Sequence, residues 1–183
     1  MSTLHVENLK GLSSGGNANK VIIPTGQTLE VADNIRHDDM PTGSVIQTVS
    51  VTYSTQVYTT STSFVDTGLT ASITPRFSSS KILISVSQAF SMVGPNDNQY
   101  QGNLIITDGS NNVIFGHDSW DQFRIKNMIA IAWQANLQHL HSPSTTSAFT
   151  YKTRMKSQLG TSNHVYAQMD DTDSNITLME IKQ

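Results

Sequence analysis

The chain has 183 residues, of which 37% are hydrophobic and only 14% are charged, and its formal net charge is −3. This balance excludes a basic field for nucleic acid, and no apolar run is long enough to predict membrane insertion. The chain has no cysteine, which excludes disulfides and cysteine-ligated zinc, and its abundance of Ser, Thr, Val and Ile favours strands over helices.

The first 43 residues predict an extended segment. Short apolar stretches alternate with Gly, Ser, Asn and Pro, so this part cannot form a hydrophobic core alone. Met1 to Glu7 also lack the charged and apolar regions of a signal peptide. We expect residues 1–43 to attach the chain to a particle and to intertwine with sister chains. The apolar residues expected to do so are Leu4, Val6, Leu9, Val21 and Ile23.

Residues 44–183 predict an antiparallel, all-β head domain of the β-sandwich or jelly-roll class. Alternating apolar and polar residues indicate strands about ten residues apart, and Asp108-Gly109 is a hairpin turn signal. A helix competes over 128–141, where Ala is frequent, but the alternation and the following Pro143 favour a strand. The expected strands span 45–53, 69–74, 81–93, 104–107, 113–115, 128–141, 146–156, 165–169 and 175–181.

The chain carries no motif for catalysis. It lacks the Gly-x-Ser-x-Gly, phosphate-loop and His-Glu-x-x-His patterns. A glycan depolymerase needs paired carboxylates in a groove, and Glu occurs only at Glu7, Glu30 and Glu180. We therefore predict a protein that is not an enzyme and needs no cofactor.

Two clusters invite a metal interpretation, and neither predicts a site. Asp170-Asp171-Thr172-Asp173 offers oxygen ligands for calcium, but the Gly and the bidentate Glu of a calcium loop are missing, which favours a solvated loop between strands. His139 and His141 point to the same side of a strand, so a parallel trimer could supply six imidazoles to one metal. Pro143 instead favours a surface pair at a strand end that titrates near neutrality.

A third cluster suggests sugar binding, because aromatic side chains combine an apolar body with a polar edge. Aromatic residues mix with Asp, Gln and Arg over 116–124, as in glycan sites, whereas Trp133 is expected in the core. The predicted receptor or glycan contacts are Tyr100, Asp118, Trp120, Gln122 and Arg124.

Several stretches resemble a known family. Residues 2–9, 23–29 and 40–47 resemble the N-terminal region of tail-fibre-like and head-fibre-like proteins of aquatic phages. Residues 79–86, 142–146 and 176–181 resemble the C-terminal β-domain of the same proteins, which is similar to the trimeric jelly rolls of tumour-necrosis-factor and complement-head domains. The resemblance implies a virion structural role and trimerisation, and it supplies no catalytic residues.

Together these observations predict a homotrimeric fibre on the exterior of a virion. Its small core per residue agrees with burial of further surface between chains. The N-terminus would anchor to tail or capsid proteins, and the head would bind a host surface receptor, for which a glycan is one candidate. The alternative is a capsid decoration protein that stabilises the head of the particle without a receptor.

Overall fold

The computed structural model describes residues 13–15, 25–26, 40–94, 99–118, 123–126 and 129–183. The chain divides into two units, Met1–Asp39 and Met40–Gln183. The described part of the second unit contains the whole fold considered below. All five predicted attachment residues, Leu4, Val6, Leu9, Val21 and Ile23, lie outside the described residues.

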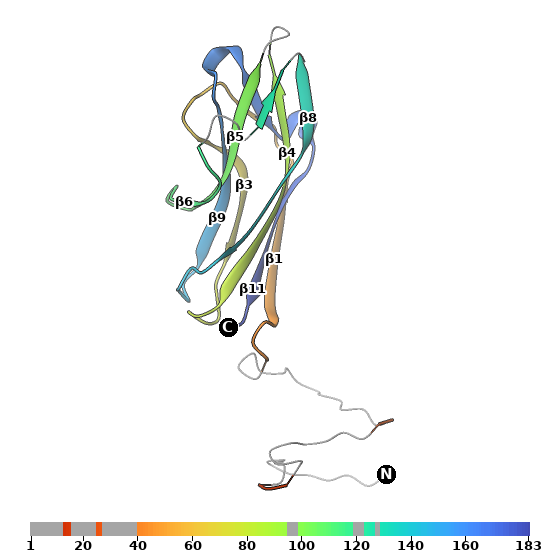
Figure 1. Ribbon diagram of the computed structural model, residues 1–183, viewed down its shortest axis with the longest axis vertical. Helices are drawn as coiled ribbons and strands as arrows, with labels where there is room; N and C mark the ends of the chain where they lie inside the picture. The colour runs from red at the N-terminus through yellow and green to blue at the C-terminus, as the bar shows by residue number, and fades with distance from the viewer. Residues whose placement is uncertain (1–12, 16–24, 27–39, 95–98, 119–122, 127–128) are drawn as a thin grey trace. The chain divides into compact units, whose positions relative to one another are not determined.

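The second unit is built from strands, which confirms the all-β prediction (Figure 1). The described residues contain eleven strands and two short 3₁₀ turns, η2 (Gly160–Ser162) and η3 (Met169–Asp171). Among them, no helix has the length and hydropathy needed to cross a membrane. The strands are β1 (Val45–Tyr53), β2 (Val57–Thr59), β3 (Val65–Ile73), β4 (Lys81–Val93), β5 (Tyr100–Asp108), β6 (Val113–Phe115), β7 (Phe123–Ile125), β8 (Ala130–His141), β9 (Phe149–Ser157), β10 (His164–Ala167) and β11 (Ser174–Ile181).

The strands form two antiparallel sheets that pack face to face. The first has the order β1-β11-β4-β10-β2, with β8 also paired to β4, and the second has the order β3-β9-β5-β6, with β7 also paired to β5. Strand β4 is central to the first sheet. On one side it pairs with β8 from Ile82 to Val93, and on the other it pairs first with β11 and then with β10.

The hydrophobic core lies between the sheets. Ile82, Ile84 and Val86 of β4 point inward, because alternate residues of a strand share one face. They pack with Leu69 of β3 and Tyr151 of β9, both fully buried. The alternation predicted for 81–93 is therefore confirmed as the inner face of the central strand.

Strand β8 confirms the predicted strand from Ala130 to His141 and excludes the competing helix there, whereas Met128 lies outside the described residues. Its inward side chains are Ile131, Trp133, Ala135 and Leu137, and its intervening residues are exposed. Trp133 packs edge-on against Phe90, with ring centroids 5.3 Å apart, so it belongs to the core as expected.

Candidate functional site

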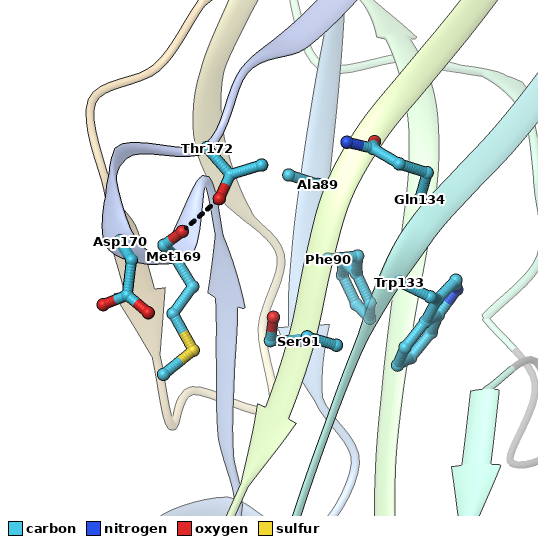
Figure 2. Close-up of a pocket in the computed structure, with 9 residues that line it drawn as sticks. Ala89, Phe90, Ser91, Trp133, Gln134, Met169, Asp170 and Thr172 are labelled. Atoms are coloured by element: carbon cyan, nitrogen blue, oxygen red, sulfur yellow. Dashed lines mark hydrogen bonds between the residues drawn. The ribbon is translucent and has the colours of Figure 1, made fainter.

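A pocket of about 290 Å³ lies on the outer face of the first sheet, where β4 and β8 run beside the η3 turn (Figure 2). This volume is close to the lower end of the range of small-molecule sites, roughly 300–1,000 Å³. The pocket therefore suits one small ring. The lining residues are Ala89, Phe90, Ser91, Ala132, Trp133, Gln134, Met169, Asp170 and Thr172.

Small side chains on two neighbouring strands make the hollow. Ser91 pairs with Ala132, and Ala89 pairs with Gln134, in the register between β4 and β8. Directly paired residues project from the same face of a sheet. Three of these four side chains are small, so they leave space above the sheet, and the η3 turn forms the wall of this space.

Ser91 gives the pocket a polar floor. The residue is 3% exposed and lines the pocket. Figure 2 shows Ser91 on β4, between the η3 turn with Met169 on one side and Trp133 of β8 on the other. The Ser91 hydroxyl can both donate and accept a hydrogen bond, so it offers a polar contact to a ligand in the pocket.

The buried Gln168 fixes the η3 turn to the sheet. Its backbone N–H donates to the Ala89 carbonyl at 3.1 Å, and its side-chain amide lies 3.0 Å from the Ser174 hydroxyl. Within the turn, the Thr172 hydroxyl donates to the Met169 carbonyl at 2.8 Å. These bonds hold the turn above the small residues of β4 and β8.

The η3 turn has a strained backbone. Gln168, Asp170 and Asp171 have φ values of 53°, 54° and 56°, in the left-handed region that residues with side chains rarely adopt. Such conformations cost about 1–3 kcal/mol each and persist only where the surroundings fix them. Here the Asp170 N–H donates to Gln56 Oε1 at 2.9 Å and the Asp171 N–H donates to the Gln168 carbonyl at 3.1 Å.

The lining chemistry favours an uncharged, hydroxyl-rich ligand. Asp170 is the one ionisable residue among the lining residues, so an anion would meet a carboxylate and no cation. Hydroxyl and amide groups of Ser91, Gln134 and Thr172 can both donate and accept hydrogen bonds. The thioether side chain of Met169 adds an apolar wall. This combination of polar contacts with an apolar surface suits a sugar ring.

The described residues among the sequence-predicted glycan contacts are Tyr100, Asp118 and Arg124, and none of them lines the pocket. Tyr100 is 1% exposed and packs in the core with Phe90, so its ring is not available to a ligand. Trp120 and Gln122 lie outside the described residues.

The other two predicted contacts are bonded within the chain. Asp118 is paired with Lys156 and accepts a hydrogen bond from Gln158 Nε2 at 3.1 Å. The Lys156 contact holds the pKa of the Asp118 carboxyl below its usual range. Arg124 donates to Gln99 Oε1 at 2.7 Å. A ligand at this segment would have to compete with these internal bonds.

The His139 and His141 pair corrects a sequence expectation. Both side chains are half-buried on the inward side of β8, rather than on the surface at a strand end. Phe115 stacks on His139 with ring centroids 5.0 Å apart, and Phe149 lies 5.5 Å from His141. Pro143 follows the end of β8 as expected, but aromatic residues of other strands cover the two imidazoles.

Within a single chain, neither the His139 and His141 pair nor the tract at 170–173 forms a metal-binding group in the described residues. The two imidazole centroids are 6.5 Å apart, and the described residues contain no group of three or more His, Asp or Glu side chains that could hold a metal. Asp170, Asp171 and Asp173 are exposed between β10 and β11, as expected of a solvated loop. Only Asp170 lines the pocket.

The pocket residues carried little signal in the sequence. Ser91 and Ala132 are 41 positions apart by number, and only the register of β4 with β8 brings them together. The polar tract at 170–173 was recognised, but its position over the sheet depends on Gln168, whose burial no local pattern indicates.

Comparisons with known proteins add little. No protein-family model and no curated protein match the chain. One solved chain that matches comes from a structure of infectious bursal disease virus, strain Gt, with 9% sequence identity and a TM-score of 0.30. The match covers 88% of this chain and 45% of that one, so this chain spans less than half of its length. A likeness of this degree carries no argument about function.

Proposed function

We propose that this chain is a non-enzymatic structural protein of a virus particle, and that its β-sandwich binds one sugar residue of a host-surface glycan. The observation that carries the binding part is the pocket between β4, β8 and η3, with Ser91 at its floor and Asp170, Gln134 and Thr172 around it. The virion part rests on the sequence resemblance to fibre-like phage proteins.

Binding would use hydroxyl groups of the sugar. One hydroxyl would bond to Ser91 Oγ, and others would donate to the Asp170 carboxylate or share hydrogen bonds with the Gln134 amide. The C–H face of the ring would pack on Met169. A site this small gives weak binding to one sugar, so useful affinity requires several heads on one particle.

The proposal extends to attachment and assembly. Residues 1–43 anchor the protein to a tail or capsid neighbour, and three chains associate into a fibre that faces outward. The mass in solution tests this part. Light scattering should give about 60 kDa, which is three times the chain mass of 20.0 kDa, or a whole multiple of that mass if trimers associate further.

The binding test uses the purified full-length chain. Ligand-observed NMR against a panel of neutral and acidic monosaccharides should detect a neutral sugar. Ser91→Ala should abolish the signal, because alanine removes the hydroxyl from the floor of the pocket without adding bulk. Asp170→Asn should weaken it by about tenfold, the factor that corresponds to about 1.4 kcal/mol.

Asp118→Asn is the matched control, because it alters a carboxylate of the segment that the sequence analysis favoured. It should bind like the wild type. If Asp118→Asn abolishes binding while Ser91→Ala does not, the glycan site lies at 116–124 and our pocket assignment is wrong. Binding of acidic sugars alone would also contradict it.

The virion assignment has a separate test. Antibodies raised against the purified protein should label intact particles in electron micrographs, at the tail or over the capsid. Labelling over the capsid lattice without any sugar binding would instead favour the decoration role. Particles that contain no such protein by mass spectrometry would overturn the assignment.

A further inference from the structure

Strand β8 is a long strand at the edge of its sheet. It pairs with β4 from Ala130 to His141 without a register shift, and the described residues include no strand on its other side. An edge strand exposes a row of unpaired backbone groups that can template pairing with another chain. At 12 residues, β8 is longer than most strands, which makes this row unusually long.

One hydrogen bond fixes which backbone groups are free. The Gly94 N–H donates to the Ile129 carbonyl at 3.1 Å, continuing the ladder between β4 and β8 by one pair. In an antiparallel pair, alternate residues direct both backbone groups toward the same neighbour. Odd-numbered residues of β8 therefore bond to β4. The even-numbered residues from Ala130 to Leu140 direct their N–H and C=O groups to the open edge.

This edge lacks the features that keep edge strands apart. Natural edges are protected by Lys, by Pro, by bulges or by inward-pointing charges. Residues 130–141 contain no Lys, Arg, Asp, Glu or Pro, and the pairing with β4 has no bulge. Leu140 is also 48% exposed on the outer face. Such an edge is suited to pairing.

We infer that β8 pairs antiparallel with β8 of a second copy of this chain, about a two-fold axis at Asn136. Residues that pair directly must project from the same face of a sheet, so the axis must fall on a residue and not between two. With the axis at Asn136, Ala132 faces Leu140 of the second copy and Gln134 faces its Gln138. The even-numbered residues then bond to one another, using the free backbone groups.

The side chains on the inner face of β8 favour a two-fold axis at Asn136 over an axis at Ala135. An axis at Asn136 sets Ala135 opposite Leu137 of the second copy, a small residue against a large one. An axis at Ala135 would set two alanines opposite each other at the core face and leave a void. The side chain of Asn136 now donates to the Gln134 carbonyl at 3.3 Å, and it must rotate away when the edge pairs.

Pairing would also complete the pocket. Ala132 lines the pocket, and Leu140 of the second copy would lie directly across from it, adding an apolar wall. The two-fold axis runs perpendicular to the sheet, so both pockets open on the same face of one continuous sheet. This consequence rests on the proposed sugar-binding function, whereas the pairing itself does not.

Two-fold pairing is a different contact from the three-fold axis of a fibre. The pairing alone gives a dimer of about 40 kDa, which is twice 20.0 kDa. Both contacts occur together only in an assembly with an even number of chains, such as a pair of trimers. The mass in solution therefore distinguishes the two-fold pairing of β8 from the three-fold contact of a fibre.

Cross-linking tests the register. The chain has no cysteine, so Asn136→Cys introduces a unique thiol. Directly bonded antiparallel residues have Cα atoms about 5.5 Å apart, which is within reach of a disulfide. Mild oxidation should convert most of the variant to a covalent dimer. Val113→Cys, 59% exposed on β6, is the matched control and should stay mainly monomeric on a denaturing gel.

Charge tests the pairing itself. Asn136→Lys sets two like charges at the axis and should halve the mass measured by light scattering, whereas Val113→Lys should not change it. Mixing Asn136→Lys with Asn136→Asp should restore the original mass. The inference is overturned if the wild type is monomeric, if it is a trimer that Asn136→Lys leaves intact, or if Asn136→Cys and Val113→Cys cross-link equally. These readouts use no sugar, so they remain informative if the glycan proposal fails.

Discussion

The Nδ1 atom of His141 lies 2.9 Å from the phenol oxygen of Tyr151, which joins β8 of one sheet to β9 of the other. Burial lowers the pKa of His141, and the neighbouring His139 adds a smaller effect of the same sign, against a weak opposing effect of Asp108. Burial also raises the pKa of Tyr151 well above its usual value. Both partners are therefore neutral near pH 7.

The first prediction is a loss of stability in mild acid. The folded pKa of His141 lies below the ordinary value of 6.5, so the unfolded chain binds more protons once the pH falls through 6.5. The free energy of unfolding should decrease below that pH and level off below the folded pKa. Urea denaturation from about pH 8 to about pH 5 measures it.

The contribution of His141 is isolated by substitution. His141→Gln retains a hydrogen-bonding group near Tyr151 but does not titrate, so its stability should fall less steeply with acid than that of the wild type. Identical slopes for the two proteins would show that His141 does not control this dependence.

The second prediction concerns Gly68, whose φ is +87°. A Cβ atom at this position would lie 2.3 Å from Cε1 of Tyr53. Gly68→Ala combines that clash with a left-handed backbone and should lower the free energy of unfolding by about 1–3 kcal/mol. In Gly109→Ala, the new Cβ would meet its nearest neighbour, Thr150 Cβ, at 3.4 Å, so this control should change stability by less than about 0.5 kcal/mol. Equal losses of stability in Gly68→Ala and Gly109→Ala would show that the Tyr53 contact and the left-handed backbone do not require glycine at position 68.

The third prediction concerns a polar network inside the core. The Thr153 hydroxyl donates to Gln88 Oε1 at 2.9 Å, and Gln88 Nε2 donates to the Ser174 hydroxyl at 2.8 Å. Gln88 and Thr153 are fully buried. Gln88→Leu leaves both hydroxyls without this partner and should cost about 1–3 kcal/mol.

A double-mutant cycle checks the coupling. Gln88→Leu combined with Thr153→Val removes both partners of one bond, so the double variant should lose less stability than the sum of the single losses. Strict additivity would mean that the two side chains do not depend on each other.

The fourth prediction concerns Glu180, a carboxylate with no exposed surface. Its Oε1 accepts from the Arg76 N–H at 2.8 Å, and its Oε2 accepts from Gln47 Nε2 at 2.5 Å. Glu180→Gln turns one acceptor into a donor that meets another donor, which should cost about 1–3 kcal/mol. Adding Gln47→Glu reverses the pair and should recover part of the loss in thermal denaturation, whereas Gln47→Ala should not.

The strand pattern was predictable wherever one face of a strand is buried. Lys81–Val93 was predicted with its observed limits, because Ile82, Ile84 and Val86 alternate with partly exposed residues. Strand β5 was predicted too short. It is buried on both faces from Tyr100 to Thr107, so its polar residues, such as Gln101 and Asn103, break the alternation without leaving the core.

The site was less predictable, because it depends on contacts between distant segments. Tyr100 sits beside polar residues in the sequence, which favoured the surface, yet the sandwich closes over its ring. The imidazoles of His139 and His141 were expected near solvent, and Phe115 and Phe149 cover them from other strands. The pocket itself requires the left-handed η3 turn, which no local sequence rule gives for Gln168.

The pairing of β1 with β11 brings the two ends of the second unit together. The Gly43 N–H donates to the Lys182 carbonyl at 2.8 Å, and the Lys182 N–H donates to the Ser44 carbonyl at 3.0 Å. Tension applied between residues 43 and 182 would therefore peel these strands apart one hydrogen-bonded pair at a time, instead of shearing the whole ladder. The same closeness makes a short linker between these two positions a tolerable circular permutation, with new ends cut in the exposed turn after Asp108.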